Sequence, residues 1–303
     1  MIENSESYKV HIVILTWNNN KILKRCLESI ENVDYKNFTI SVIDNNSSDD
    51  SLRMISENFP NVQTIKNSKT VKFGRGYNEG LKKINFEDND FIILLNDETI
   101  VSRNFIDELI NPLAKDQKAI ISTPKIVYSS NINKIWYAGG VVDLWRGLIY
   151  HIGIRDFDGP KYSFINETHY ATGCCMCLRF EDLKKLNFFD VTFDMYCEDV
   201  DLSLKARQLN RNIIYAPKSV ILHNVSQSLG EHSSKKNFIK KLRNNKIIYI
   251  GPDQSPWEHR NKYSHKSNEL FLFDYDKIPL IKKYLNCSFS QNLQIGTIVI
   301  ATC

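Results

Sequence analysis

Continuous apolar runs alternate with helix-spaced apolar residues through the first half of the chain. The run VHIVIL (Val10–Leu15) is apolar at nearly every position, which is typical of a strand buried on both faces. Residues 21–30 then repeat apolar side chains every three or four positions, as a helix does. The order returns at residues 38–59 and again through residues 73–127. Four strands separated by helices predict a mostly parallel, Rossmann-like α/β sheet with helices on both faces.

Three of the predicted strands end in clusters of polar residues. These clusters are Thr16–Asn18, Asp44–Asn46 and Asn96–Glu98. A single polar strand end is most simply a turn. In open parallel sheets, however, ligands bind beyond the carboxyl ends of the strands. Three such ends in neighbouring strands therefore predict a binding site along this edge of the sheet.

The residue pattern changes near residue 128: the following residues are rich in Gly, Trp and Tyr and contain only short apolar stretches. A strand followed by a helix is predicted over residues 169–190, and a second helix over residues 198–210. We interpret residues 128–230 as the second half of the same domain, covering the strand ends. Residues 231–303 begin with a lysine-rich helical pattern and continue without clear periodicity, so they are predicted to form a basic helix and a C-terminal extension.

Composition narrows the class of protein. The chain has 303 residues, 42% of them hydrophobic, and a formal net charge of only +4. This mild charge gives no support to nucleic-acid binding. Seven scattered cysteines, an odd number, favour a reducing cytoplasm over a disulfide framework. We find neither a secretory signal nor an apolar stretch of the roughly 20 residues that span a bilayer, so a soluble or peripheral protein is expected.

Oxygen-rich strand ends suit a divalent cation, because Mg²⁺ and Mn²⁺ prefer hard oxygen ligands and share them with substrate phosphates. Glu98 is the first candidate ligand, with Asp97 behind it. His223 follows another apolar run and adds an imidazole that Mn²⁺ accepts readily. A lone histidine after a strand is more often structural, so this candidate needs spatial evidence.

Two further stretches allow a structural and a functional interpretation. FGRGYNEG (73–80) is either a glycine-containing helix entry or a loop where Arg75 and Asn78 approach a sugar diphosphate. Glu198 and Asp199 are adjacent at a predicted helix start, where acidic residues are favoured by about 0.3–1 kcal/mol. In the functional interpretation they supply a general base, a role worth roughly 10²–10⁴ in rate.

Together these motifs resemble glycosyltransferase family 2, and within it the rhamnosyltransferase-like branch. The resemblance rests on stretches that follow in family order over residues 10–245: VHIVILTWNNNKILKRCLESI, VIDNNSSDDS, FGRGYNEGL, IWYAGGVVDLWRGLIYHIG, YATGCCMCLRFEDLKKLNFFD, MYCEDVDLSLKARQLN and VILHNVSQSLG. It implies a GT-A fold, with a nucleotide-binding half at about 8–127 and an acceptor-side half at about 128–230.

The resemblance also implies an inverting sugar transfer from a nucleoside diphosphate sugar, dTDP-rhamnose or a UDP-sugar, to a cell-envelope glycan or lipid-linked acceptor. It assigns the base to Asp199, with Glu198 beside it, and the cation, Mn²⁺ or Mg²⁺, to Glu98, Asp97 and His223. Donor contacts are expected from one further set of residues: Thr16, Trp17, Asn18, Asp44, Asn46, Arg75, Asn78, Asn96 and Asp97.

Two departures from the family pattern matter. The metal motif, usually Asp-x-Asp, is Asn96-Asp97-Glu98 here, so the cation geometry differs. The stretch QLNRN at Gln208 lacks the tryptophan of processive members, which predicts addition of one sugar. A nucleotidyltransferase is disfavoured because no glycine-rich, arginine-containing loop follows the first strand. A non-catalytic nucleotide- or carbohydrate-binding relative remains the alternative.

The basic stretch at residues 235–246 also has two interpretations. It is either a solvated helix face or a contact with an anionic membrane surface that presents a lipid-linked acceptor. We therefore expect a cytoplasmic protein. A peripheral contact with the inner face of the membrane is the second hypothesis.

Overall fold

The computed structural model describes residues 8–143, 148–193 and 197–224. The chain divides into two units, and the first comprises residues 1–140 and 152–225. The described part of the second unit is residues 141–143 and 148–151, which lie in the two-stranded sheet of β8 and β9. The predicted basic helix at residues 235–246 lies outside the described residues, and the domain boundary predicted at residue 230 stays a prediction.

The secondary structure follows the predicted alternation of strands and helices over its first half. The strands are β1 (Val10–Thr16), β2 (Phe38–Asp44), β3 (Gln63–Lys66), β4 (Phe91–Asn96), β5 (Thr99–Val101), β6 (Ala119–Tyr128), β7 (Asn131–Tyr137), β8 (Gly140–Asp143), β9 (Leu148–His151), β10 (Asn166–Glu167), β11 (Cys175–Arg179) and β12 (Asn212–His223). The helices are α1 (Asn20–Ile30), α2 (Ser51–Asn58), α3 (Phe73–Leu81), α4 (Phe105–Lys115), α5 (Phe180–Lys185), α6 (Glu198–Gln208) and the short 3₁₀ helix η2 (Pro160–Tyr162).

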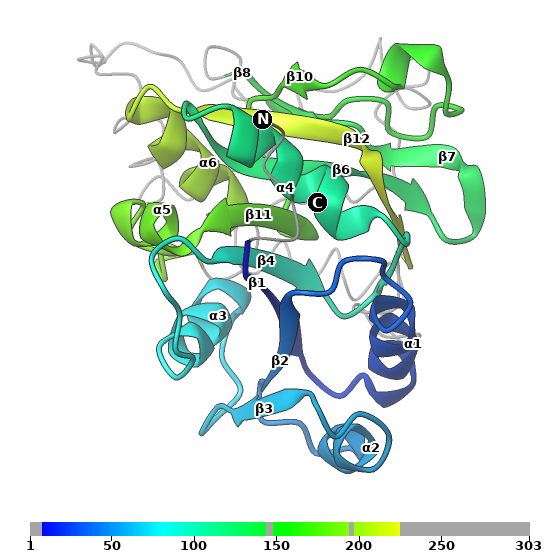
Figure 1. Ribbon diagram of the computed structural model, residues 1–303, viewed down its shortest axis with the longest axis vertical. Helices are drawn as coiled ribbons and strands as arrows, with labels where there is room; N and C mark the ends of the chain where they lie inside the picture. The colour runs from blue at the N-terminus through cyan, green and yellow to red at the C-terminus, as the bar shows by residue number, and fades with distance from the viewer. Residues whose placement is uncertain (1–7, 144–147, 194–196, 225–303) are drawn as a thin grey trace, which may run out of the picture. The chain divides into compact units, whose positions relative to one another are not determined.

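Ten of the described strands form one sheet, in the order β10-β12-β6-β11-β4-β1-β2-β3, with β5 beside β12 and β7 beside β6 (Figure 1). Strands β3, β2, β1 and β4 are mutually parallel. Strand β11 lies antiparallel between β4 and β6, and β12 is parallel to β6. The prediction of a mostly parallel α/β sheet is confirmed. The sequence pattern did not reveal that β11 runs antiparallel to its neighbours β4 and β6.

Helices cover both faces of this sheet, and the central strands β1 and β4 accordingly bury side chains on both sides. Helix α1 buries Leu23, Cys26, Leu27 and Ile30, which are the apolar positions that the helical spacing selected. Helix α4 packs on β6, β11 and β12, while α3 packs on β1 and β2. Figure 1 shows α3, α5 and α6 along one side of the strands and α1 on the other.

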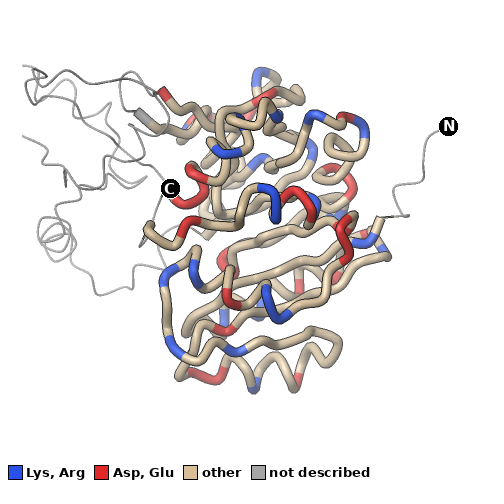
Figure 2. The backbone as a smooth tube through the Cα atoms, turned by 90° about the vertical axis from the view of Figure 1, so that its left-hand side faces the viewer, with Lys and Arg blue, Asp and Glu red and all other residues tan. Residues whose placement is uncertain are grey.

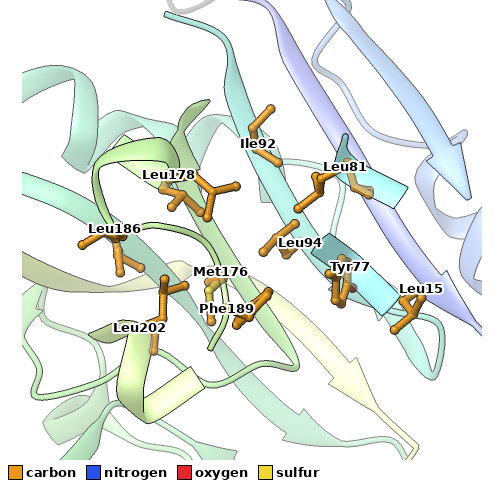
Figure 3. Packing of buried hydrophobic residues seen from close by; sticks show 14 of the residues in the cluster. Leu15, Tyr77, Leu81, Ile92, Leu94, Met176, Leu178, Leu186, Phe189 and Leu202 are labelled. Carbon is orange, nitrogen blue, oxygen red and sulfur yellow. The ribbon is translucent and has the colours of Figure 1, made fainter. Parts of the chain in front are cut away.

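A cluster of buried apolar side chains joins α3, α5 and α6 to the sheet (Figure 3). Leu15 and Leu94 of the sheet lie beside Tyr77 of α3, and Leu178 lies beside Leu186. Gly80 of α3 sits so close to β2 that an added Cβ would be 2.3 Å from Cδ1 of Ile43. Glycine thus allows α3 to approach the sheet closely enough to bring its N-terminal turn to the strand ends.

Charges are distributed along the chain with both signs interleaved, as Figure 2 shows for the described residues on the side facing the viewer. Among the described residues, no helix has the length and apolar character needed to cross a membrane.

Candidate active site

The polar ends of β1, β2 and β4 meet at one edge of the sheet, as the parallel pairing requires. Thr16 is in register with Asp44 on the neighbouring strand, and Leu15 is in register with Asn96 on the other side. Strand β1 therefore lies between the two other polar ends. The predicted row of polar strand ends is confirmed as a spatial arrangement.

Thr16 and Asp97 form the tightest contact in this row. The Thr16 hydroxyl donates a 2.6 Å hydrogen bond to Oδ2 of Asp97, and both side chains are buried. Burial raises the pKa of Asp97 to about 6, although the Thr16 hydrogen bond acts in the opposite direction. Asp97 is thus anchored behind the edge by Thr16.

Two loops at this edge are tied together through Asn18. Asn18 has a φ of 51°, in the left-handed region that asparagine tolerates, and its Oδ1 accepts a 2.7 Å hydrogen bond from the Ser48 backbone N–H. Asn46 also has a positive φ, of 63°, and Trp17 is 54% exposed. An exposed indole between two ordered loops offers a flat apolar surface at the predicted nucleotide site.

Asp44 and two buried asparagines organise the neighbouring loop. Asp44 Oδ1 accepts a hydrogen bond from Ser47 N at 3.0 Å. Asn45 binds both backbone polar groups of Val71, with Nδ2 to the carbonyl at 2.7 Å and Oδ1 to the amide at 3.1 Å. Asn67, buried beside them, was missed from the sequence; its position directly after a strand was the available signal.

The glycine-containing stretch at 73–80 lies within helix α3 rather than in a preceding loop. Gly76 packs against Leu15, where an added Cβ would be 3.1 Å from both Cδ atoms. Asn78 is held by the Phe189 backbone, with hydrogen bonds of 2.8 Å to the carbonyl and 3.2 Å from the amide. Arg75 is exposed. Helix–sheet packing therefore explains Gly76, and the Phe189 hydrogen bonds tie Asn78 to the segment that precedes α6.

Glu98 and His223 come together although they lie far apart in the sequence. Strand β12 runs antiparallel to β5, with His223 opposite Thr99, and the Asn224 N–H donates to the Glu98 carbonyl at 2.9 Å. His223 Nε2 lies 3.9 Å from Glu98 Oε2, and both side chains are buried. The Trp136 ring packs edge-on against the imidazole at a centroid distance of 4.5 Å.

The chemistry of this pair fits a divalent cation. Burial lowers the pKa of His223 to about 4, so the imidazole is neutral at pH 7 and can act as a ligand. Its Nδ1 is buried without a hydrogen-bond partner. No group of three or more His, Cys, Asp or Glu residues suited to a metal occurs within the described part of the chain. A cation here would take two protein ligands and complete its shell with substrate phosphates and water, as Mg²⁺ usually does.

Helix α6 begins at Glu198, as predicted, after Cys197 with a φ of 70°. Asp199 accepts two backbone hydrogen bonds of 2.8 Å, to Oδ2 from Gly173 and to Oδ1 from Val200. Burial raises the pKa of Asp199, while these two N–H groups act to lower it. The carboxylate is therefore buried but has two donors that favour its ionised form.

Glu198 has the opposite environment. Its Oε2 is buried without a hydrogen-bond partner, and burial together with the neighbouring Asp199 charge raises its pKa. Asp199 has N–H donors at both carboxylate oxygens, whereas one oxygen of Glu198 has none, so we assign the negative charge of the pair to Asp199 and the proton to Glu198. Two adjacent carboxyl groups with different protonation states are typical of general acid–base sites.

A cavity of about 330 Å³ lies elsewhere in the same unit, between the loop after residue 152 and strands β10 and β12. Its lining residues are Ala138, Gly139, Ile152, Lys161, Tyr162, Asn166, Glu167, Thr168 and Tyr215. None of the predicted site residues belongs to this lining.

Comparison with known proteins finds similar sequences over most of the chain. The family model described as glycosyl transferase family 2 matches residues 11–186. Rhamnosyltransferase WbbL of Escherichia coli (strain K12) is 24% identical over 77% of this chain and 88% of its own length. The N-acetylglucosaminyl-diphospho-decaprenol L-rhamnosyltransferase of Mycobacterium tuberculosis (strain CDC 1551 / Oshkosh) is 20% identical over 81% of this chain and 85% of its own.

A solved structure shares the fold. Mannosyltransferase PcManGT from Pyrobaculum calidifontis, in complex with GDP-Man and Mn²⁺, superposes with a TM-score of 0.55 at 15% identity. The match covers 80% of this chain and 62% of that protein, so this chain spans less than two thirds of its length. The fold is that of the GT-A glycosyltransferases, as the resemblance implied.

Proposed function

Because the chain belongs to glycosyl transferase family 2, we propose that it transfers a single sugar, with inversion, from a nucleoside diphosphate sugar to an acceptor hydroxyl. The observation that carries the proposal is the approach of His223 to Glu98 at the same sheet edge as Thr16 and Asp44. A donor site needs a place for the diphosphate next to a place for the nucleoside. The Glu98–His223 pair beside Thr16 and Asp44 supports such a pairing of a diphosphate site with a nucleoside site.

The proposed donor site occupies the edge formed by β1, β2 and β4. Its donor contacts are Thr16, Trp17, Asn18, Asp44, Asn46, Arg75, Asn78, Asn96 and Asp97. Glu98 and His223, with Asp97 behind them, would hold Mn²⁺ or Mg²⁺. When bound, such a cation neutralises charge that develops on the leaving diphosphate.

The proposed base is Asp199, which takes the proton from the acceptor hydroxyl. The acceptor oxygen forms a bond to the anomeric carbon while the bond from that carbon to the diphosphate oxygen breaks. The electron pair of the broken bond leaves on the diphosphate. Attack from the face opposite to the leaving group inverts the anomeric configuration. Glu198 stays protonated next to Asp199, so the site carries one negative charge fewer when the anionic donor binds.

For the donor we propose dTDP-rhamnose, with a UDP-sugar as the second choice, because two relatives are named rhamnosyltransferases. The acceptor we propose is a cell-envelope glycan or a lipid-linked sugar, since one relative's name contains a decaprenol-linked diphosphate. We also propose that the enzyme is cytoplasmic and contacts the membrane surface through residues 235–246. Sedimentation with liposomes that shows no dependence on anionic lipid would remove the membrane contact.

The test is thermal stabilisation by UDP, dTDP and GDP, each with Mn²⁺, Mg²⁺ or EDTA. A ligand that binds only the native state raises the melting temperature, by an amount set by its concentration relative to its Kd. We expect a shift with dTDP that needs the divalent cation and disappears with EDTA. No shift with any nucleotide would refute the proposed donor site.

A further inference from the structure

One short segment contacts both halves of the proposed site. The Gly173 N–H donates to Oδ2 of Asp199 at 2.8 Å, and the carbonyl of the next residue, Cys174, accepts from Asn96 N at 2.9 Å. Asn96 is the last residue of β4 and leads directly to Glu98. Two consecutive residues therefore connect the base to the strand that delivers the cation ligand.

Ser203 ties this segment to helix α6. It is fully buried one turn after Asp199, and its hydroxyl donates to the Asp199 carbonyl at 2.8 Å. The same hydroxyl accepts a 3.1 Å hydrogen bond from the Ala171 N–H. A serine inside a helix commonly bonds back to the carbonyl four residues earlier. Here its oxygen also satisfies a buried amide of another segment, two residues before Gly173.

Two side chains of the sheet hold other parts of the segment. The Tyr137 hydroxyl donates to the Tyr170 carbonyl at 2.5 Å, and Thr123 Oγ1 donates to the Cys175 carbonyl at 3.0 Å. Both anchors lie on the sheet. Beside the Gly173–Asp199 bond itself, the Ser203 hydroxyl gives this segment a second hydrogen bond to the helix that carries Asp199.

We infer that Ser203 is a positioning residue that holds the Gly173 N–H against the Asp199 carboxylate by clamping Ala171 to helix α6. The inference rests on the proposed function only in calling Asp199 the base. The clamp fixes the direction of one carboxylate oxygen and supplies a donor that favours its ionised form. Ser203 itself contacts no substrate.

The groups around Asp199 make its ionisation sensitive to this clamp. Glu198 beside it, Cys197 at the start of the helix and Tyr137 on the sheet are its titratable neighbours. Burial raises the pKa of Cys197 and of Tyr137, so both are neutral near pH 7. Among these three neighbours none is a cation, so the backbone N–H donors have to favour the charged form of Asp199.

The experiment follows the Gly173 amide proton by NMR across a pH titration of the full-length protein, without substrate. Asp199→Asn supplies the reference for a lost carboxylate contact. In Ser203→Ala we expect the Gly173 resonance to move upfield, as in a weaker hydrogen bond. The midpoint of its titration should rise by about half a pH unit or more. Ser203→Thr keeps the hydroxyl and should restore the wild-type resonance.

Ser29 offers a matched control. Its hydroxyl donates to the Cys26 carbonyl, three residues earlier in helix α1, at 2.7 Å and accepts from Val101 N at 3.1 Å, which is a similar pair of contacts. Ser29→Ala should leave the Gly173 resonance and its midpoint unchanged. A melting curve of each variant confirms that it is folded. If Ser203→Ala does not fold, Ser203→Cys, with its weaker hydrogen-bonding thiol, is judged by the same two readouts.

The inference is overturned if folded Ser203→Ala, or Ser203→Cys in its place, keeps the wild-type Gly173 resonance and midpoint. It is also overturned if Ser29→Ala produces the same change. Failure of the proposed function is distinguishable, because it appears in transfer assays rather than in the spectrum. Full transferase turnover by Asp199→Asn, with the expected spectral changes in Ser203→Ala, would leave the clamp intact and remove Asp199 as the base.

Discussion

Thr16 at the end of β1 donates its hydroxyl proton to Asp97 just beyond β4, at a distance of 2.6 Å. The bond joins two polar strand ends across the edge where the donor is proposed to bind. Asp97 is 8% exposed, so water cannot readily replace this donor. The contact thus links the architecture of the sheet directly to the proposed site.

Replacing Thr16 by Val should destabilise the protein by about 1–3 kcal/mol, because a buried carboxyl group loses one of its hydrogen-bond donors. Urea unfolding at pH 7 measures the difference. Thr64→Val is the control: this threonine is exposed on β3, and its replacement should change the free energy of unfolding by less than about 0.5 kcal/mol. Equal effects of the two substitutions would show that the Thr16–Asp97 bond contributes nothing specific.

Asp199→Asn should lower turnover by roughly 10²–10⁴, since the amide cannot accept a proton from the acceptor. Its binding of the donor nucleotide should stay within about twofold of wild type, because Asp199 belongs to the acceptor side. Turnover is measured with the donor identified by thermal stabilisation, and binding by calorimetry. Unchanged turnover would remove Asp199 as the base.

Glu98→Gln should weaken Mn²⁺ binding by about tenfold or more, comparable to the 10–100-fold effects of groups that support metal sites. The measurement is the Mn²⁺ electron paramagnetic resonance signal in the presence of nucleotide. Glu167→Gln on β10 is the matched control, because Glu167 is exposed and bonds to Asn212 at 2.7 Å instead. Equal Mn²⁺ affinity in both variants would exclude Glu98 as a ligand.

Glu198→Gln should change the pH dependence of stability. The folded pKa of Glu198 is raised, so the folded state retains this proton over a pH range in which the unfolded chain has lost it. The wild type therefore loses stability as pH rises from the unfolded pKa of about 4.3 up to the folded value. The Gln variant lacks this loss.

The expected outcome is that Glu198→Gln is more stable than wild type by over about 1 kcal/mol at pH 8, since each pK unit corresponds to about 1.4 kcal/mol. At pH 4 the two proteins should be equally stable. Denaturant unfolding over this range provides the comparison. A variant that is less stable than wild type at pH 8 would contradict a protonated Glu198.

Gly80→Ala should destabilise the protein by about 1–3 kcal/mol, because the new methyl group would overlap Ile43 at 2.3 Å. The higher helix propensity of alanine offsets up to about 1 kcal/mol of this cost. Gly159→Ala is the matched control, since a Cβ there meets nothing within 4 Å. Thermal unfolding of both variants tests whether close packing, and not flexibility, explains this glycine.

The sequence by itself determined the alternation of strands and helices and the polar ends of β1, β2 and β4. These features are local: strands buried on both faces are continuous apolar runs, and amphipathic helices repeat apolar residues with a period of about 3.6. Because parallel strands end at one edge, Thr16, Asp44 and Asn96 had to converge once the strands were recognised. The polar strand ends also made Glu98 the first candidate ligand, and the family resemblance assigned the base to Asp199 of the acidic pair at the start of α6.

Only the tertiary structure decided which distant groups meet. The order of strands in the sheet brings His223 to Glu98 and Gly173 to Asp199, and neither pairing has a local signal in the sequence. The reversed strand β11, inserted between β4 and β6, places Gly173 where the base needs a donor. Such contacts depend on strand order and on burial summed over the whole sheet, so residue spacing fixes the elements while long-range packing builds the site.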